Sequence, residues 1–184
     1  MPDLRDGVEL YLPAGVYAGT LVLHDRPFDL YGAEEGGRTV FAGGIQMRAM
    51  DEQIVGGRVS YLSRLDFTGD GGVGVSAAGR VWIQECAFSG WKTAVLSYGE
   101  TWINVTDCTF RDNVTGLHFN DANATPSDSH FTGNTFEGNG TAVLLEAVPS
   151  DLTLDFSDCV FTGNGTDIDN RCGQPVNIAQ AVFQ

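Results

Sequence analysis

The feature that most constrains this fold is a short unit that recurs along the chain. Its clearest copies begin at Cys86, Cys108, Asn134 and Cys159. Each copy has a Phe two residues after its start, an Asn or Trp three residues later, and a Thr two residues after that. Aligning these units gives a column of phenylalanines: Phe67, Phe88, Phe110, Phe136 and Phe161. The first copy fits least closely, because Gly72 and Gly74 stand where later copies have Thr and an apolar residue.

Within each unit, apolar and polar residues alternate over a few positions, which is typical of short strands. Consecutive units carry the same pattern rather than its mirror image, so equivalent strands must stack in parallel, about 4.8 Å apart. Each coil then buries its apolar face only against its neighbours. The repeat therefore predicts an all-β fold, a parallel β-helix of about seven coils. Residues 1–184 are expected to form a single domain, with the phenylalanines inside.

The units end in Gly-Asn or Asp-Asn, and both Asn and Gly tolerate the left-handed backbone of a sharp corner. Asn113, Asn139 and Asn164 are therefore interpreted as corner residues, although each also begins an Asn-x-Thr sequon. The sequons at Asn104 and Asn123 lie outside this column.

Three of the four cysteines share one inward column with an asparagine: Cys86, Cys108, Asn134 and Cys159. Small buried thiols are the expected state. A disulfide between Cys86 and Cys108 is the alternative, because these two residues are one coil apart.

Both ends of the chain depart from the repeat. The first coil of a β-helix exposes strand edges that are normally covered, and residues 1–7 are too short to form a capping helix. The cover is expected from a preceding domain or a partner chain, so we predict that this domain belongs to a longer protein. Residues 171–184 are expected to close the last coil.

The segments Val8–Tyr17 and Leu21–Gly32 resemble the opening coil of pectate-lyase-like right-handed β-helix proteins. The later Cys/Asn-x-Phe-x-x-Asn units are similar to the generic repeat of that superfamily. The resemblance implies a right-handed parallel β-helix. It also implies work on or near carbohydrates, since the superfamily includes polysaccharide lyases, glycoside hydrolases, epimerases, phage tailspikes and surface adhesins.

The formal net charge is −14, with Lys92 as the single lysine. A field of this sign repels phosphate backbones, so nucleic acid is excluded as a partner. No apolar run is long enough to insert into a membrane. The many carboxylates permit binding of Ca²⁺, which takes oxygen ligands. The first seven residues lack the pattern of a signal peptide.

The side chains six residues before each Phe are expected to form a row that faces solvent: Tyr61, Trp82, Asn104, His130 and Asp155. Trp102 and Arg80 lie close by, eight residues before their Phe. Aromatic rings beside Asp, Asn and His suit a sugar, which offers an apolar face and hydroxyl edges. The predicted ligand-binding residues are Tyr61, Trp82, Trp102, Asn104, His130 and Asp155.

A second row lies three residues before each Phe, near a corner: Arg64, Glu85, Asp107, Gly133 and Asp158. Glu85 and Asp107 would repel each other unless a cation or a proton intervened, so they are the predicted Ca²⁺ ligands. The irregular segment 120–130 lengthens one coil and is expected to lie over these two rows, here called the strip, near His130. A solvated bulge is the alternative.

The leading functional prediction is an extracellular module for binding or display, associated with carbohydrate, on a bacterial or phage surface. A polysaccharide or glycan is the expected partner, together with neighbouring domains of a longer chain. No catalytic residue is assigned, because zinc spacing, a Ser-His-Asp arrangement and a phosphate-binding loop are all missing. One alternative is a polysaccharide lyase or glycoside hydrolase fragment, since Glu85 and Asp107 have the spacing of a retaining pair. The other is a structural stalk or oligomerisation element.

Overall fold

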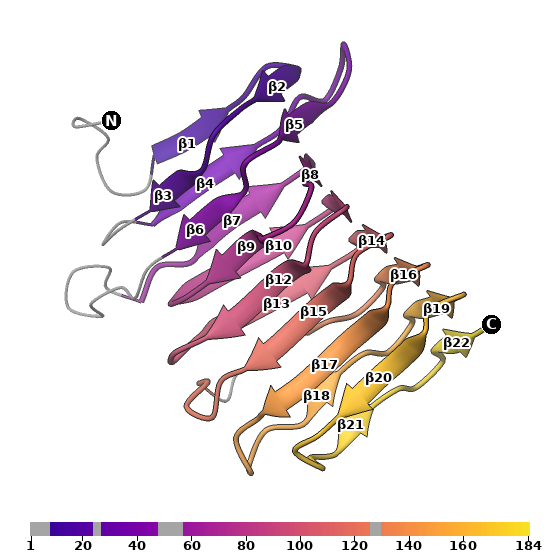
Figure 1. The fold of residues 1–184 in the computed structure, drawn as a ribbon. Helices are drawn as coiled ribbons and strands as arrows, with labels where there is room; N and C mark the ends of the chain where they lie inside the picture. Colours follow the sequence, from indigo (N-terminus) through magenta and orange to yellow (C-terminus); the bar gives the residue numbers. More distant parts are fainter. Residues whose placement is uncertain (1–7, 24–26, 48–56, 126–129) are drawn as a thin grey trace.

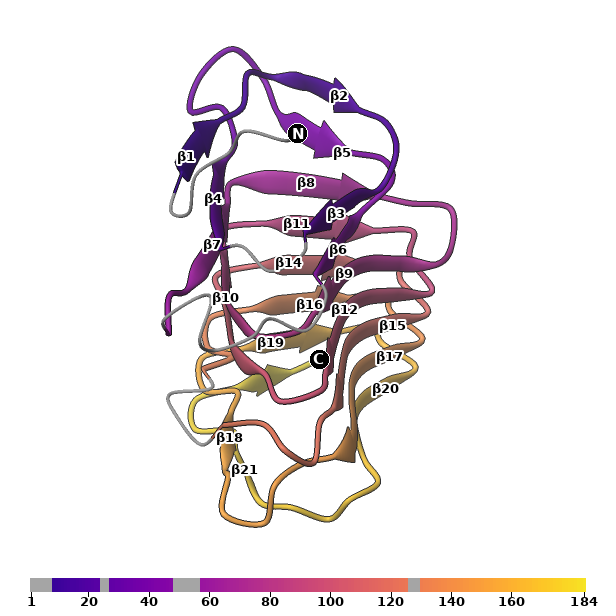
Figure 2. The same ribbon diagram turned by 90° about the vertical axis from the view of Figure 1, so that its left-hand side faces the viewer.

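The computed structural model describes residues 8–23, 27–47, 57–125 and 130–184. No helix occurs within these ranges, and the strands form three long parallel sheets and one two-stranded sheet along a stack of coils (Figure 1). Figure 2 shows the three sheets as the walls of the coils. The predicted all-β solenoid is therefore confirmed. Residues 1–7, which the sequence analysis judged too short to form a capping helix, lie outside the described ranges.

Each of the first five coils contributes one strand to each of the long sheets, and the later coils continue sheets B and C. Sheet A contains β1 (Val8–Tyr11), β4 (Phe28–Tyr31), β7 (Ser60–Ser63), β10 (Arg80–Gln84) and β13 (Trp102–Thr106). Sheet B contains β2 (Gly15–Tyr17), β5 (Thr39–Phe41), β8 (Leu65–Thr68), β11 (Ala87–Ser89), β14 (Thr109–Arg111), β16 (Thr135–Glu137), β19 (Val160–Thr162) and β22 (Val182–Phe183). Sheet C contains β3 (Leu21–Leu23), β6 (Ile45–Met47), β9 (Val73–Ala77), β12 (Thr93–Tyr98), β15 (Thr115–Asn120), β17 (Thr141–Ala147) and β20 (Thr166–Asn170). A short pair is formed by β18 (Leu154–Asp155) and β21 (Val176–Asn177).

A continuous stack of aromatic rings fills the tube behind sheet B. The rings belong to Tyr17, Phe41, Phe67, Phe88, Phe110, Phe136, Phe161 and Phe183. Neighbouring ring centroids are 4.7 Å apart at the closest pair and 5.6 Å at the widest, so the rings follow the spacing of the coils. The predicted inward column is confirmed, and it extends two coils further towards the N-terminus and one coil further towards the C-terminus.

The C-terminal segment, residues 171–184, forms part of this extension. β21 pairs in parallel with β18, and β22 pairs with β19 so that Phe183 stacks on Phe161. Residues 171–184 therefore continue the stack in register, although their sequence departs from the repeat. The Phe183 side chain is 46% exposed.

In the coils from β7 onwards, left-handed residues occupy two of the corners. Between sheets A and B these are Arg64, Glu85, Asp107, Gly133 and Asp158, with φ from 52° to 70°. Between sheets B and C they are Gly90, Asp112, Gly138 and Gly163, with φ from 55° to 77°. The asparagines that follow this second corner do not have positive φ. The prediction that they supply the left-handed backbone was wrong by one position, because their side chains are needed inside the coil.

Those side chains form a ladder of hydrogen bonds along the solenoid. The Oδ1 atom of Asn139 accepts from the backbone N–H of Asn113 (3.1 Å) and from its Nδ2 (3.0 Å). The Nδ2 atom of Asn139 donates to the carbonyl of Phe110 (2.9 Å) and to Oδ1 of Asn164 (3.0 Å). The ladder begins where the Trp91 N–H donates to Asn113 Oδ1 (3.0 Å).

The predicted register is off by one residue in one corner. Thr93 pairs with Val73, and Val95 pairs with Val75, rather than with the glycines at 72 and 74. The corner before β9 contains one extra residue, which the positive φ of Gly71 and Gly72 accommodates.

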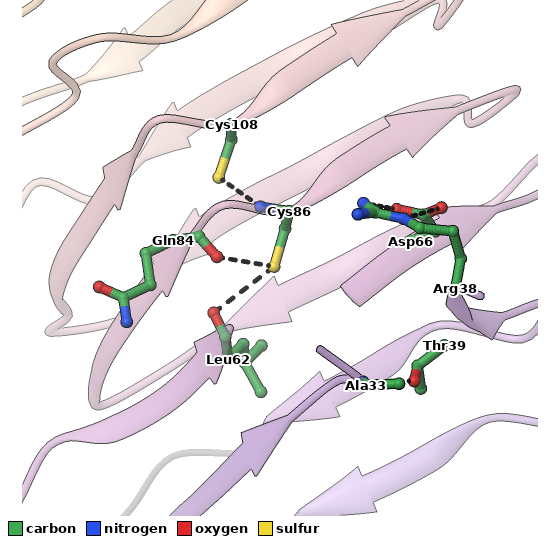
Figure 3. A network of polar contacts seen from close by, with 8 residues as sticks. All are labelled: Ala33, Arg38, Thr39, Leu62, Asp66, Gln84, Cys86 and Cys108. Carbon is green, nitrogen blue, oxygen red and sulfur yellow. Dashed lines mark hydrogen bonds and ion pairs between the residues drawn. The ribbon is translucent and has the colours of Figure 1, made fainter. Parts of the chain in front are cut away.

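The cysteine column is buried and reduced, as expected. Figure 3 shows Cys86, whose N–H donates to Sγ of Cys108 (3.4 Å) and whose thiol lies 3.2 Å from the carbonyl of Gln84. Burial raises the pKa of the Cys108 thiol, and burial raises the pKa of Cys159 to about 12. Asn134 occupies the same column and accepts from the Cys108 N–H at Oδ1 (2.8 Å).

Replacement of Phe110 by Ala tests the aromatic stack. The ring is fully buried between Phe88 and Phe136, so its loss removes packing and leaves a cavity. We expect the free energy of unfolding to fall by about 3–5 kcal/mol in urea titration. Thr109→Ala, on the outer side of the same strand, is the control. A cost for Phe110→Ala no larger than that of the control would contradict the stacked core.

Replacement of Asn139 by Ala tests the ladder. The change leaves the buried Asn113 N–H and the Phe110 carbonyl without their partners. Each such group costs about 1–3 kcal/mol, so the midpoint of urea unfolding should fall clearly. Asn123→Ala, at an exposed position, should leave the midpoint unchanged. Equal midpoints for the two variants would show that the ladder is dispensable.

Thiol chemistry tests the cysteine column. A thiol with a raised pKa favours the protonated form in the folded state, so the stability that Cys159 contributes is present below pH 9 and is lost as the pH rises towards 12. In the native protein at neutral pH, an alkylating reagent should modify the half-buried Cys172 first. Peptide mass spectrometry checks this order, and equal labelling of Cys159 and Cys172 would be the opposing result.

Candidate functional site: the outer face of sheet A

The outward side chains of sheet A line up in rows, because the strands pair in register. One row contains Glu9, Asp29, Tyr61, Trp82 and Asn104. The sequence predicted this row from Tyr61 onwards. The structure extends it across the first two coils to Asp29 and Glu9.

The same row continues beyond β13 as a run of polar groups. The backbone N–H of His130 donates to Oδ1 of Asn104 (3.0 Å), and His130 forms a parallel bridge with Asp155. Asn177 follows in register, and its Nδ2 donates to Oδ1 of Asp155 (3.0 Å). The structure therefore brings together the predicted residues Asn104, His130 and Asp155.

Aromatic side chains occupy the middle of the row. Tyr61 and Trp82 stack with their ring centroids 6.0 Å apart and an angle of 25° between the planes. The indole Nε1 of Trp82 donates to Oγ1 of Thr106 (3.0 Å), so this ring reaches across to the next strand. Trp102 lies in an adjacent row, paired in register with Arg80. All three aromatic rings are half-buried, which leaves part of each open to solvent.

Asn104 is a correction to the sequence prediction, which placed it on the solvent side. Its side chain is only 1% exposed. Trp82 and His130 flank it in register, and its Oδ1 already accepts the His130 N–H. Asn104 therefore joins β13 to the segment at His130 through this hydrogen bond, and its buried amide does not face a ligand.

A second aromatic pair was missed by the sequence analysis. Tyr11 and Tyr31 stack on the same outer face, with ring centroids 5.1 Å apart. The Arg64 guanidinium lies 5.7 Å from the Tyr31 centroid, and its Nη2 is 3.2 Å from a carboxylate oxygen of Glu34. The sequence does contain a signal for this pair, because an acidic residue, Leu and Tyr occur in the same order in both strands. The alignment of the repeat began at Phe67 and so did not include it.

The N-terminal part of this face carries a negative field. Burial raises the pKa of Asp29, and the charge of Glu9 raises it further, although the Tyr61 N–H donates to the carboxylate (3.2 Å) and opposes the shift. Burial also raises the pKa of Tyr31, with Asp29 and Glu9 adding to the effect. Both pKa shifts arise first from burial and then from the neighbouring negative charges.

Glu85 and Asp107 lie on consecutive coils at the corner beside this face, and both are exposed. A Cβ built on Gly133 would lie 2.5 Å from Asp107 Oδ1, so this carboxylate turns towards the following coil and away from Glu85. No group of three or more His, Cys, Asp or Glu side chains suited to a metal ion occurs within the described ranges. Ca²⁺ binding by Glu85 and Asp107 stays a prediction, as does their use as a glycosidase pair.

The irregular segment after β15 is anchored by a buried carboxylate. Asp121 accepts hydrogen bonds from the N–H groups of Glu100 (3.0 Å) and Thr101 (2.7 Å), and from the Thr101 hydroxyl (2.7 Å). Thr125 then donates its N–H to the Thr101 carbonyl (2.9 Å). Residues 126–129 lie outside the described ranges, so the expectation that segment 120–130 lies over the strip near His130 stays a prediction.

Among the described residues, none form a helix that is long and apolar enough to cross a membrane. A search of curated proteins and of solved structures gave no significant match to this chain. The family model described as "Right handed beta helix region" matches residues 44–181, well over half of the chain. This match confirms the right-handed sense that the sequence resemblance implied. With its parallel coils, its in-register aromatic stack and this match, the chain belongs to the right-handed β-helix family.

Proposed function

We propose that this domain is an extracellular glycan-binding module, displayed on a bacterial or phage surface, and that the outer face of sheet A is its binding surface. The observation that carries the proposal is the in-register aromatic row of Tyr61 and Trp82, with Trp102 beside it and Tyr11 and Tyr31 on the preceding coils.

Sugar rings suit this surface for a physical reason. One face of a pyranose presents C–H groups, which pack against aromatic rings, and its edges present hydroxyl groups. Beyond β13, the row that contains Tyr61 and Trp82 continues into the polar side chains of His130, Asp155 and Asn177. Apolar contact and hydrogen bonding are therefore available within a few coils of each other.

The shape of the surface favours a polymer over a single sugar. Equivalent outward positions recur at each coil, about 4.8 Å apart along the solenoid axis. A polysaccharide laid along this axis would meet one outward row after another. Weak contacts at several coils then combine into useful affinity, because each further contact is intramolecular.

Glycan-array binding, followed by titration with the best oligosaccharide, tests the proposal. Trp82→Ala and Tyr61→Ala should each weaken binding by about 10-fold or more, since burying an aromatic side chain is worth about 1.5–3 kcal/mol. Tyr98→Ala is the matched control, because Tyr98 is an exposed aromatic residue on sheet C.

Two outcomes would contradict the proposal. One is the absence of binding to any glycan on the array. The other is binding that Tyr98→Ala weakens as much as Trp82→Ala does. Release of unsaturated or reducing sugars from a bound polysaccharide, abolished in Asp107→Asn, would instead support the alternative of a lyase or hydrolase.

A further inference from the structure

The first two strands of sheet A alternate acid and tyrosine on the outer face. β1 presents Glu9 and Tyr11, and β4 presents Asp29 and Tyr31. The strands pair so that carboxylate lies beside carboxylate and ring lies beside ring. The Tyr11 hydroxyl donates to Oε2 of Glu9 (3.1 Å), which holds this carboxylate next to the stacked rings. Two carboxylates and two aromatic rings thus occupy one patch, here called the acid–tyrosine patch.

One cation already lies against this patch. The Arg64 guanidinium lies over the Tyr31 ring while also contacting the Glu34 carboxylate. A ring face and a carboxylate together are a favourable site for a cation, because the ring quadrupole and the negative charge act in the same direction. The ring face of Tyr31 is therefore already in contact with a positively charged side chain.

The charges around the face are predominantly negative. The carboxylates on its strands and along its edges belong to Glu9, Asp29, Glu34, Glu85, Asp107, Asp155 and Asp158. The basic side chains on or beside it are those of Arg58, Arg64, Arg80 and His130. The chain as a whole carries a formal charge of −14, so its long-range field has the same sign as the local one.

We propose that the outer face of sheet A binds glycans with free amino groups, such as glucosamine polymers, and discriminates against uronate glycans. This inference rests on the proposed function, and it specifies the substrate class. The ammonium groups of the sugar pair with Glu9 and Asp29, while its rings pack against the tyrosines and Trp82. A uronate carboxylate meets like charge at the same positions, which disfavours its binding.

Three oligosaccharides of equal length test the inference: the glucosamine, N-acetylglucosamine and galacturonate hexamers. Titration calorimetry at a pH that keeps the amine protonated should rank glucosamine tightest and galacturonate weakest. The advantage of glucosamine should shrink at high ionic strength, because exposed charge pairs are screened. Glu9→Gln and Asp29→Asn should each weaken glucosamine binding by about 2- to 5-fold and leave N-acetylglucosamine binding unchanged.

Glu146→Gln is the control for net charge, because it removes the same charge from sheet C. It should leave the ranking of the three hexamers unchanged. Urea unfolding of each variant checks that the fold is intact. Oligolysine of matched charge separates recognition of a sugar from simple attraction to a polycation.

The outcomes divide clearly. If galacturonate or N-acetylglucosamine binds as tightly as glucosamine, and Trp82→Ala weakens all three, the charge inference is overturned while glycan binding stands. If no hexamer binds but another glycan on the array does, the charge inference is overturned while glycan binding stands. If no glycan on the array binds either, both proposals are overturned. If oligolysine binds as tightly as the glucosamine hexamer, and Trp82→Ala changes neither affinity, the attraction is to charge alone and the inference is again overturned.

Discussion

The whole molecule depends on coils that stack in register, so that a side chain in one coil meets its own equivalent in the next. The parallel backbone ladder sets the spacing, and the aromatic stack from Tyr17 to Phe183 fixes the register. A one-residue slip would turn each ring outwards and place polar groups in the tube. Hence the same constraint that builds the core also determines which residues meet on the surface.

On the outer surface, this register places side chains that are one repeat apart in the sequence next to each other in rows. Tyr61 and Trp82 are 21 residues apart in the chain but stack directly, and the acid–tyrosine patch arises from two strands with one shared pattern. A flat sheet with rows of this kind offers repeated shallow contacts rather than an enclosed cavity. That geometry suits an extended partner with its own repeat, which is the basis of the proposed glycan binding.

The sequence predicted most of the fold, because inward positions need the same residue type in every coil and so leave a visible period. Three features could not be read in this way. The burial of Asn104 depends on its neighbours Trp82 and His130, not on strand alternation. The left-handed residue at the second corner, such as Asp112, directly precedes an asparagine of equal turn preference. Tyr11 and Tyr31 lie in coils whose core ring is not always Phe, so alignment on Phe passed over them.

The asparagine ladder begins only at Trp91, and the coils before it turn the same corner without such side chains. In a solenoid, each coil is held mainly by its two neighbours, so stability is distributed along the axis. Among the residues that the structure describes, the N-terminal coils that carry the acid–tyrosine patch have no asparagine in this ladder. A polymer bound along sheet A would contact coils on both sides of this boundary, and its binding would raise the melting temperature of the N-terminal coils.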